Sequence, residues 1–489
     1  MSSKKAVVIG AGIAGIATAI RLAIKGYEVE VFEANATPGG KLAEVTNDKF
    51  RFDAGPSLLT MPQYIDELFA LAGKDAGKYF QYQKLNVICK YFYEDGTRLT
   101  AYADKEKFEK EITTHTGESA EALQRQAANS AQIFELTNPV FLERAFKGFK
   151  EIFTKDGFKA FLNLKKLDTG RIMHQANQGI FKDERIVQFY DRYATYNGSN
   201  PYAAPATLNI IPHLEQELGA YFPTGGMYSI VTSLVDLATM VGVKFNYNSP
   251  VDEIVLNGKK ATGIKVKGEV INADIMVSNM DIWFTYNKLL KDYPKLHPKK
   301  ILAQERSSSA LVFYWGINKK FAKLDLHNIF FSADYKAEFD QIWKEKTIYH
   351  DPTVYVNITS KLKPKDAPPE CENWFVMINV PANTGQDWDT LIADARKNIL
   401  VKLASLLNEN ISKLIIRETV LDPRDIESKT SSYQGSIYGT SSNNKYAAFN
   451  RHANQSAIKN LYFVGGSVHP GGGIPLCLLS AKIVAEEVN

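Results

Sequence analysis

Cysteine is scarce in this chain, and the three that are present lie far apart. Cys89, Cys371 and Cys477 form no CxxC pair and match no zinc-binding spacing. This odd and scattered set excludes a disulfide framework and favours a reducing compartment. The eight histidines include no HxxxH pair or similar spacing. The sequence therefore predicts no protein-bound metal.

The chain also lacks a strong net charge and a long apolar run. Its formal net charge is +4 over 489 residues, which argues against nucleic acid as a partner. No uncharged apolar stretch reaches the roughly 20 residues of a membrane-spanning helix, so we expect no transmembrane segment. The uncharged run from Ala6 to Ile20 is unlike a signal peptide, because three glycines interrupt it and no small-residue cleavage site follows. With 45% hydrophobic residues, the chain has enough apolar material for two or more domains.

The N-terminal segment has the pattern of a dinucleotide-binding strand, turn and helix. Ala6 to Ile9 predicts a buried strand, a GxGxxG turn and an apolar helix follow, and Val29 to Phe32 predicts a second strand. Glycines let the backbone approach a pyrophosphate at the positive end of the helix, and an acidic residue after the second strand binds a ribose diol. The alternative interpretation is a tight turn in an empty Rossmann-like unit. The candidate residues are Gly10, Gly12, Ile13, Ala14, Gly15, Glu33 and Ala34.

Two further motifs follow directly. A second glycine pair precedes Lys41, and the segment NDKFRFDAGPSLL comes next. Together they resemble the flavin-binding glutathione-reductase-like folds, above all the amine-oxidase and phytoene-desaturase branch, in which both segments run beneath an extended FAD. The resemblance therefore implies FAD rather than a nicotinamide, although Lys41 has the alternative of a solvated surface lysine. The residues implied are Gly39, Gly40, Lys41, Gly55, Pro56, Ser57 and Leu58.

The C-terminal stretch VGGSVHPGGGIPLCLL raises the same expectation. A buried strand from Leu461 to Val464 precedes the glycines, and a helix is predicted to begin near Ile474 or Pro475. Such a helix start offers free N–H groups and partial positive charge to a flavin. HPGGGIP resembles the C-terminal signature of bacterial carotenoid desaturases, which implies flavin contacts for Gly465, Gly466, Gly473, Ile474 and Pro475. His469 has two open interpretations, a direct role near the flavin or a turn histidine bonded to its own backbone.

The middle of the chain is expected to return to the FAD domain. The segment from Phe222 to Val266 combines a glycine turn, a helix and strands, and the resemblance implies that Val251 contacts the adenine end. A buried strand follows, with Asn279 and Asp281 at its tip. We expect an α/β fold with a Rossmann-like FAD-binding domain of the glutathione-reductase and amine-oxidase type, a discontinuous β-sheet substrate domain and a helical insert. The predicted divisions are 1–75, 220–285 and 435–489 for the FAD domain, 76–219 for the insert and 286–434 for the sheet.

The insert contains a basic, phenylalanine-rich segment at 139–166. From Glu143 to Lys166 it carries seven basic and three acidic residues, with phenylalanines at spacings of three to five. A helix of this kind lies in a membrane interface with its apolar face inward and its lysines at the headgroups. The alternative is a surface helix packed on the core. We expect a cytoplasmic protein bound peripherally to the inner face of the cell membrane.

Four alternating, aromatic-rich segments predict the sheet that covers the flavin. They are 309–317, 327–332, 353–360 and 373–381. Four aromatic residues in them have two open interpretations, the lining of an apolar tunnel or ordinary core packing. These residues are Phe313, Trp315, Trp374 and Phe375.

From end to end, the chain resembles the bacterial phytoene-type carotenoid desaturases, and among them most the 1'-hydroxycarotenoid 3,4-desaturases. The resemblance implies a carotenoid substrate, hydride transfer to flavin N5, loss of a proton, and quinone or oxygen as electron acceptor. Arg192 and Tyr196 are candidates to accept the proton, with a structural turn as the alternative. Where the family has arginine-proline, this chain has Arg451 and His452, which leaves that turn open. Carotenoid isomerases and saturases share the motifs, and prenyl-binding GDP-dissociation inhibitors share the architecture without a flavin.

Overall fold

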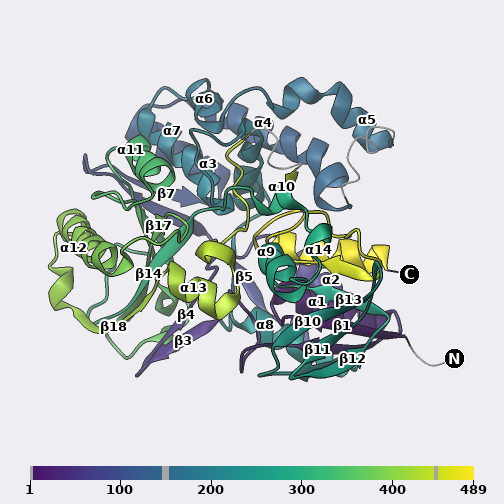
Figure 1. The fold of residues 1–489 in the computed structure, drawn as a ribbon. Helices are drawn as coiled ribbons and strands as arrows, with labels where there is room; N and C mark the ends of the chain where they lie inside the picture. Colours follow the sequence, from purple (N-terminus) through teal and green to yellow (C-terminus); the bar gives the residue numbers. More distant parts are fainter. Residues whose placement is uncertain (1–3, 146–153, 445–449, 489) are drawn as a thin grey trace.

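The computed structural model describes residues 4–145, 154–444 and 450–488 (Figure 1). One sheet has five parallel strands and draws them from three distant stretches of the chain, as expected for a discontinuous nucleotide-binding domain. In order across the sheet, the strands are β19 (Leu461–Phe463), β13 (Ile275–Ser278), β1 (Lys5–Ile9), β2 (Glu28–Phe32) and β9 (Lys244–Asn246).

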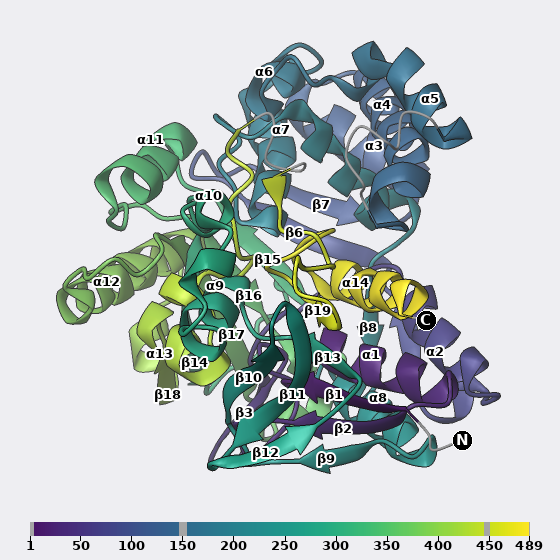
Figure 2. The ribbon, with the colours of Figure 1, turned by 45° about the vertical axis from the view of Figure 1, so that its right-hand side comes forward.

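Both faces of this parallel sheet are covered. Alternate side chains of β1 point to opposite sides, so each face carries apolar residues that pack against another layer. Val7 and Ile9 pack against a three-stranded antiparallel sheet, whereas Ala6 and Val8 pack under a helical layer. Figure 2 shows the helices and the small sheet on the two sides. The helical layer comprises α1 (Ile13–Ile24), α2 (Gln63–Leu71), α8 (Ser229–Met240) and α14 (Ile474–Glu487), and the small sheet comprises β10 (Val251–Asn257), β11 (Lys260–Val266) and β12 (Glu269–Asn272).

The second large sheet has seven strands and is antiparallel except where β15 and β6 run parallel. It contains all four segments predicted to form the covering sheet, with shorter bounds for the second and third. The segment expected to be mainly helical contributes the last two strands of this sheet, since residues 87–92 and 98–102 pair with each other and 87–92 also pair with β15. The strands in order are β18 (Ile415–Leu421), β14 (Ser309–Ile317), β17 (Glu372–Val380), β16 (Val354–Asn357), β15 (His327–Phe330), β6 (Val87–Phe92) and β7 (Arg98–Tyr102).

The two faces of the paired strands β14 and β17 answer the question of the aromatic residues. Phe313, Trp315 and Trp374 are buried in a cluster with α12 (Trp388–Leu407), so core packing accounts for them. Phe375 lies on the opposite face, in a cluster with Phe52 of the hairpin formed by β3 (Glu44–Asn47) and β4 (Phe50–Asp53). One of the four aromatic residues therefore faces the side on which the glycine motifs lie.

A helical layer covers the remaining side of the molecule, at the top of Figure 1. In the described ranges, no helix is long and apolar enough to cross a membrane. The layer contains α3 (Lys105–Thr116), α4 (Ala120–Thr137), α5 (Lys155–Leu162), α6 (Met173–Gln178) and α7 (Glu184–Asp191). The remaining strands and α-helices of the described residues are the two-stranded sheet of β5 (Tyr82–Lys84) and β8 (Tyr221–Pro223), and the short helices α9 (Ile282–Phe284), α10 (Lys299–Leu302), α11 (Tyr335–Asp340) and α13 (Pro423–Thr430).

Candidate active site

The first glycine turn is closed tightly between β1 and α1. The N–H of Gly10 donates a hydrogen bond of 2.8 Å to the carbonyl of Phe32, which ties the turn to β2. A Cβ atom on Gly15 would lie 2.2 Å from the carbonyl oxygen of Gly10, so this position excludes a side chain. Ile13 and Ala14, which were predicted to contact the cofactor, form the buried start of α1, and Gly12 caps the helix without a side-chain hydrogen bond.

Asn279, at the end of β13, joins this turn to the C-terminal one. Its Oδ1 accepts a hydrogen bond of 3.1 Å from the N–H of Gly15, and its Nδ2 donates one of 3.1 Å to the carbonyl of Val464. A Cβ atom on Gly12 or Gly465 would approach the Asn279 amide to 2.6 or 2.5 Å. The two glycine motifs therefore meet around one amide side chain.

Glu33 is buried at the end of β2, in the position predicted for a ribose-binding acid. Its Oε2 accepts a hydrogen bond of 2.7 Å from the N–H of Ala11, and its Oε1 accepts bonds from the backbone and side chain of Asn35. A carboxylate oxygen has two lone pairs, so Oε2 retains capacity for a diol. Ala34 is exposed, and Val251 is buried at the start of β10.

The second glycine pair and the GPS segment stack beside the first turn. The N–H of Gly39 donates to the carbonyl of Ala11 at 2.8 Å. A Cβ atom on Gly40 would lie 3.6 Å from the Cα of Gly12, and one on Gly55 would lie 1.8 Å from the carbonyl oxygen of Lys41. These contacts bring the N-terminal motifs into one continuous surface.

Many of the predicted contact residues of this surface are partly accessible, whereas Gly15, Gly39, Gly465 and Ile474 are buried. Partial exposure is found at each of the three N-terminal segments and at the C-terminal turn. The partly exposed residues are Gly10, Gly12, Gly40, Lys41, Gly55, Ser57, Leu58, Asn279, Gly466, Gly473 and Pro475, and Pro56 is exposed. The motifs therefore meet at a surface that solvent partly reaches, and we expect an extended dinucleotide to lie along it.

The C-terminal turn leads directly into the start of α14. The helix begins at Ile474, one residue after Gly473, and its first turn has no side-chain cap among the described residues. A Cβ atom on Gly466 would lie 3.3 Å from the Cα of Gly472, so the two halves of the motif touch. The uncapped N–H groups give this helix end a partial positive charge.

His469 points away from the glycine motifs and toward the helical insert. Its Nε2 lies 3.0 Å from the carbonyl oxygen of Arg144, and its ring meets Phe141 edge to face at 4.9 Å. Burial lowers the pKa of His469 to about 4, so the ring is neutral at physiological pH. The catalytic role of His469 stays a prediction, and the structure adds a contact between the turn and the insert.

Arg192 and Tyr196 are brought together around a residue that the sequence did not indicate, Glu215. The guanidinium of Arg192 donates to the hydroxyls of Tyr196 at 3.1 Å and Tyr91 at 2.8 Å, and lies 3.5 Å from Glu215. The hydroxyl of Tyr196 donates in turn to Glu215. Burial, together with the charge of Glu215, raises the pKa of Tyr196 well above its usual value. Tyr196 is therefore protonated at neutral pH, and its hydroxyl proton is directed at the Glu215 carboxylate.

Between the glycine motifs lies a group of charges with an excess of cations. Lys41 donates to the carbonyls of Ser436 and Ile437 at 3.3 and 3.1 Å, and burial lowers its pKa. Arg306 is buried, and none of its guanidinium nitrogens has a hydrogen-bond partner among the described residues. The Asp281 carboxylate lies 3.7 Å away, and a buried guanidinium whose N–H groups make no hydrogen bond is costly, so this group fits an anionic ligand. The diphosphate of FAD is such a ligand, and the residues present fit it.

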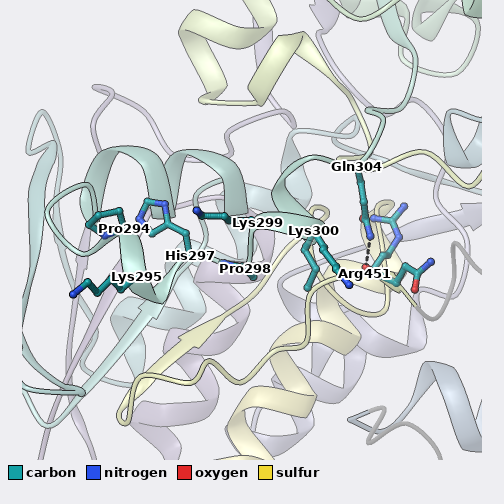
Figure 3. A pocket seen from close by; sticks show the side chains of 10 residues that line it. Pro294, Lys295, His297, Pro298, Lys299, Lys300, Gln304 and Arg451 are labelled. Carbon is teal, nitrogen blue, oxygen red and sulfur yellow. Dashed lines mark hydrogen bonds between the residues drawn. The ribbon is translucent and has the colours of Figure 1, made fainter.

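The guanidinium of Arg451 closes this region from the outside. It donates hydrogen bonds of 2.9 to 3.0 Å to the carbonyls of Tyr438, Gly466 and Thr440. These bonds fix the conformation of the turn at Arg451 and His452, which the sequence did not predict. On its outer side is a cavity of about 1000 Å³ that no sequence motif indicated (Figure 3). It is lined by Pro294, Lys295, His297, Pro298, Lys299, Lys300, Ile301, Gln304, Asn450 and Arg451.

Comparisons with solved structures agree with this architecture. An oxidoreductase from Methanosarcina mazei matches with a TM-score of 0.65 at 15% identity, covering 99% of this chain and 100% of that one. Wild-type putrescine oxidase bound to putrescine matches with a TM-score of 0.63 at 14% identity, covering 99% of both chains. These likenesses establish the fold.

Comparisons of sequence go further. The 1-hydroxycarotenoid 3,4-desaturase of Flavobacterium sp. (strain P99-3) is 50% identical over 99% of this chain and 98% of its own. The 4,4'-diapolycopene oxygenase of Methylomonas sp. is 33% identical over 99% and 98%, and the phytoene desaturase of Neurospora crassa is 32% identical over 99% and 84%. The family model described as flavin containing amine oxidoreductase matches residues 13–489. Together with the geometry above, this match identifies the chain as an FAD-dependent oxidoreductase that belongs to the flavin containing amine oxidoreductase family.

Proposed function

We propose that this enzyme introduces carbon–carbon double bonds into a carotenoid, and that it desaturates the 3,4 position of a 1'-hydroxylated carotenoid. The observation that carries the proposal is the 50% identity with the 1-hydroxycarotenoid 3,4-desaturase of Flavobacterium sp., which extends over 99% of this chain. The relatives at 32 and 33% identity carry names of other carotenoid enzymes, so the likeness to the hydroxycarotenoid enzyme is the more specific one.

The residues of the chain supply orientation and charge. A bound FAD supplies the acceptor for the hydride that leaves one carbon of the substrate. The uncapped start of α14 favours negative charge beside it, since the partial positive charge of a helix N-terminus is concentrated in the first turn. The neighbouring carbon loses a proton, for which we propose the cluster of Arg192, Tyr196 and Glu215. A proton that reaches the Tyr196 hydroxyl passes to Glu215, to which that hydroxyl already donates.

The substrate is lipophilic, and α5 offers a surface for delivery from a membrane. Phe158 and Leu162, one helical turn apart, are 54% and 66% exposed, and Lys155 and Lys159 on the same helix are exposed. Phe146, Phe149 and Phe153 of the same basic segment lie outside the described residues. We propose peripheral binding to the inner face of the cell membrane through 139–166, with quinone or oxygen accepting the electrons.

Two alternatives keep the architecture and change the chemistry. An isomerase or saturase would rearrange or remove double bonds, and a prenyl-lipid carrier of the GDP-dissociation-inhibitor type would bind no flavin. The orphaned Arg306 and the glycine contacts favour an occupied cofactor site over an empty carrier. The number and position of the double bonds in the product distinguish a desaturase from an isomerase or saturase.

The test is anaerobic absorption spectroscopy of the FAD-loaded protein with liposomes that contain a 1'-hydroxylated carotenoid. We expect the oxidised flavin band to bleach while the carotenoid spectrum shifts to the red, as conjugation lengthens. Liposomes with the matching carotenoid that lacks the hydroxyl are the control for substrate class. Bleaching with both carotenoids would confine the proposal to desaturation in general, and a carotenoid change without bleaching would favour the isomerase.

A further inference from the structure

Arg306 is a buried cation that protein groups leave unsatisfied. This residue lies three positions before the start of β14 and is 3% exposed. All three guanidinium nitrogens lack a hydrogen-bond partner in the part of the chain that the structure describes. The closest carboxylate belongs to Asp281, at 3.7 Å, which exceeds hydrogen-bond length. That carboxylate accepts a bond of 2.8 Å from the N–H of Trp283, so it caps α9 instead.

The guanidinium is nevertheless held in place. It lies over the ring of Tyr433 at 5.0 Å, and that ring stacks on Trp283 with 3.8 Å between centroids. The backbone of Arg306 forms a bridge to Thr440 in the segment that Arg451 fixes. A flat aromatic support leaves the buried N–H groups of the guanidinium without hydrogen bonds, and a planar set of donors suits recognition of an anion.

Three cations share this region with one carboxylate. Burial is the main cause of the lowered pKa of both Lys41 and Arg451, and the charge of Arg306 lowers each pKa further, so Arg306 lies close enough to repel both groups. The carboxylate of Asp281 offsets one of them, which leaves an excess of two positive charges. A bound ligand that carries two negative charges would balance this excess.

We propose that Arg306 binds the diphosphate of FAD and completes the anion site that the glycine turn and Lys41 begin. Lys41 follows Gly40, where a Cβ atom would lie 3.6 Å from the Cα of Gly12 at the start of α1. Asp281 follows Asn279 by two positions, and Asn279 lies among the glycines of that same turn. The inference depends on FAD as the cofactor and is independent of which carotenoid the enzyme uses.

The experiment measures ligand binding to the apoprotein of the full chain. Arg306→Met is expected to weaken FAD binding about 10- to 100-fold, the range for a lost hydrogen bond to a charged group. ADP has the diphosphate without the flavin, so its affinity is expected to fall by a similar factor. Because no described protein group hydrogen-bonds the Arg306 guanidinium and its ion pair with Asp281 is long, at 3.7 Å, the melting temperature of the apoprotein should stay nearly unchanged or rise. Arg306→Lys should restore part of the FAD affinity.

Two variants serve as controls. Arg417→Met removes an exposed arginine paired with Asp48 and should leave FAD and ADP binding unchanged. Arg451→Met removes the bonds to three carbonyls and should lower the melting temperature of the apoprotein. The proposal is overturned if Arg306→Met destabilises the apoprotein without changing FAD affinity. It is also overturned if FAD binding weakens while ADP binding does not, because Arg306 would then face the flavin end.

Discussion

The side-chain oxygen of Asn279 accepts a hydrogen bond of 3.1 Å from the N–H of Gly15, which lies 264 positions earlier in the chain. The same amide donates to the carbonyl of Val464, so one side chain connects β13 to both glycine motifs. The turns that surround the cofactor site are therefore held at a fixed separation by protein groups.

Replacing Asn279 with alanine should loosen this connection. Two backbone groups lose their partners, and we expect a loss of about 1–3 kcal/mol in the free energy of unfolding together with weaker FAD retention. Denaturant unfolding and the FAD content after gel filtration measure the two effects. Asn287→Ala is the matched control, because that amide is exposed and donates to one carbonyl of its own turn. Equal stability losses in both variants would contradict the connecting role.

Gly55 is required by packing rather than by backbone conformation. A Cβ atom there would lie 1.8 Å from the carbonyl oxygen of Lys41, a backbone atom that cannot rotate away. Gly55→Ala should therefore cost about 1–3 kcal/mol of stability and displace Lys41 from the cofactor site, reducing FAD affinity. Thermal melting and FAD titration provide the measurements. Gly170→Ala, where a Cβ meets no atom within 4 Å, should change neither quantity.

The exposed apolar pair on α5 should govern membrane binding. We expect Phe158→Asp combined with Leu162→Asp to reduce co-sedimentation with phosphatidylcholine–phosphatidylserine vesicles about tenfold or more, because apolar burial and attraction to anionic lipid are both weakened. Val401→Asp is the control, since Val401 is 64% exposed on α12, outside this segment. Unchanged sedimentation of the double variant would show that α5 is an ordinary surface helix.

The neutral state of His469 makes stability depend on pH. Its pKa is lowered from 6.5 to about 4, first by burial, so the unfolded chain binds more protons than the folded one between these values. This contribution is complete above pH 6.5 and is lost as the pH falls toward 4, at about 1.4 kcal/mol per pH unit. His469→Gln should therefore flatten the decline of unfolding free energy in this window. His115→Gln, at an exposed site on α3, should leave the decline as steep as in the unmodified protein.

The Glu215 carboxylate should stabilise the cluster that it forms with Arg192 and Tyr196, and its loss should lower the free energy of unfolding. Removing one partner of a buried ion pair leaves the other uncompensated, so we expect Glu215→Gln to cost about 3–5 kcal/mol. In the Arg192→Met and Glu215→Gln double variant, the loss should be smaller than the sum of the two single losses. Denaturant unfolding of the three variants measures the coupling. Additive losses would contradict a direct interaction between the two side chains.

Several elements of the fold followed from local sequence, and others did not. The strands and helices beside the glycine turns were predicted nearly to the residue, because an apolar run ended by glycines leaves few alternatives. Residues 82–102 were assigned to a helical region and instead form strands, since such short runs are decided by the sheet edge they join. The alternation in β14 showed two faces but could not indicate which one packs on α12.

The sequence by itself determined at which positions the backbone must lack side chains, because glycine turns and helix starts depend on residues close together in the chain. Only the tertiary structure decided which side chains lie beside these turns and contact one another there. Three features each depend on residues that are not neighbours in the chain. They are the contact of His469 with Arg144, the ion pair of Arg192 with Glu215, and the lack of hydrogen bonds at the Arg306 guanidinium. Hydrogen bonds and charges act over a few ångströms in space, and the spacing of letters in a sequence does not record those distances.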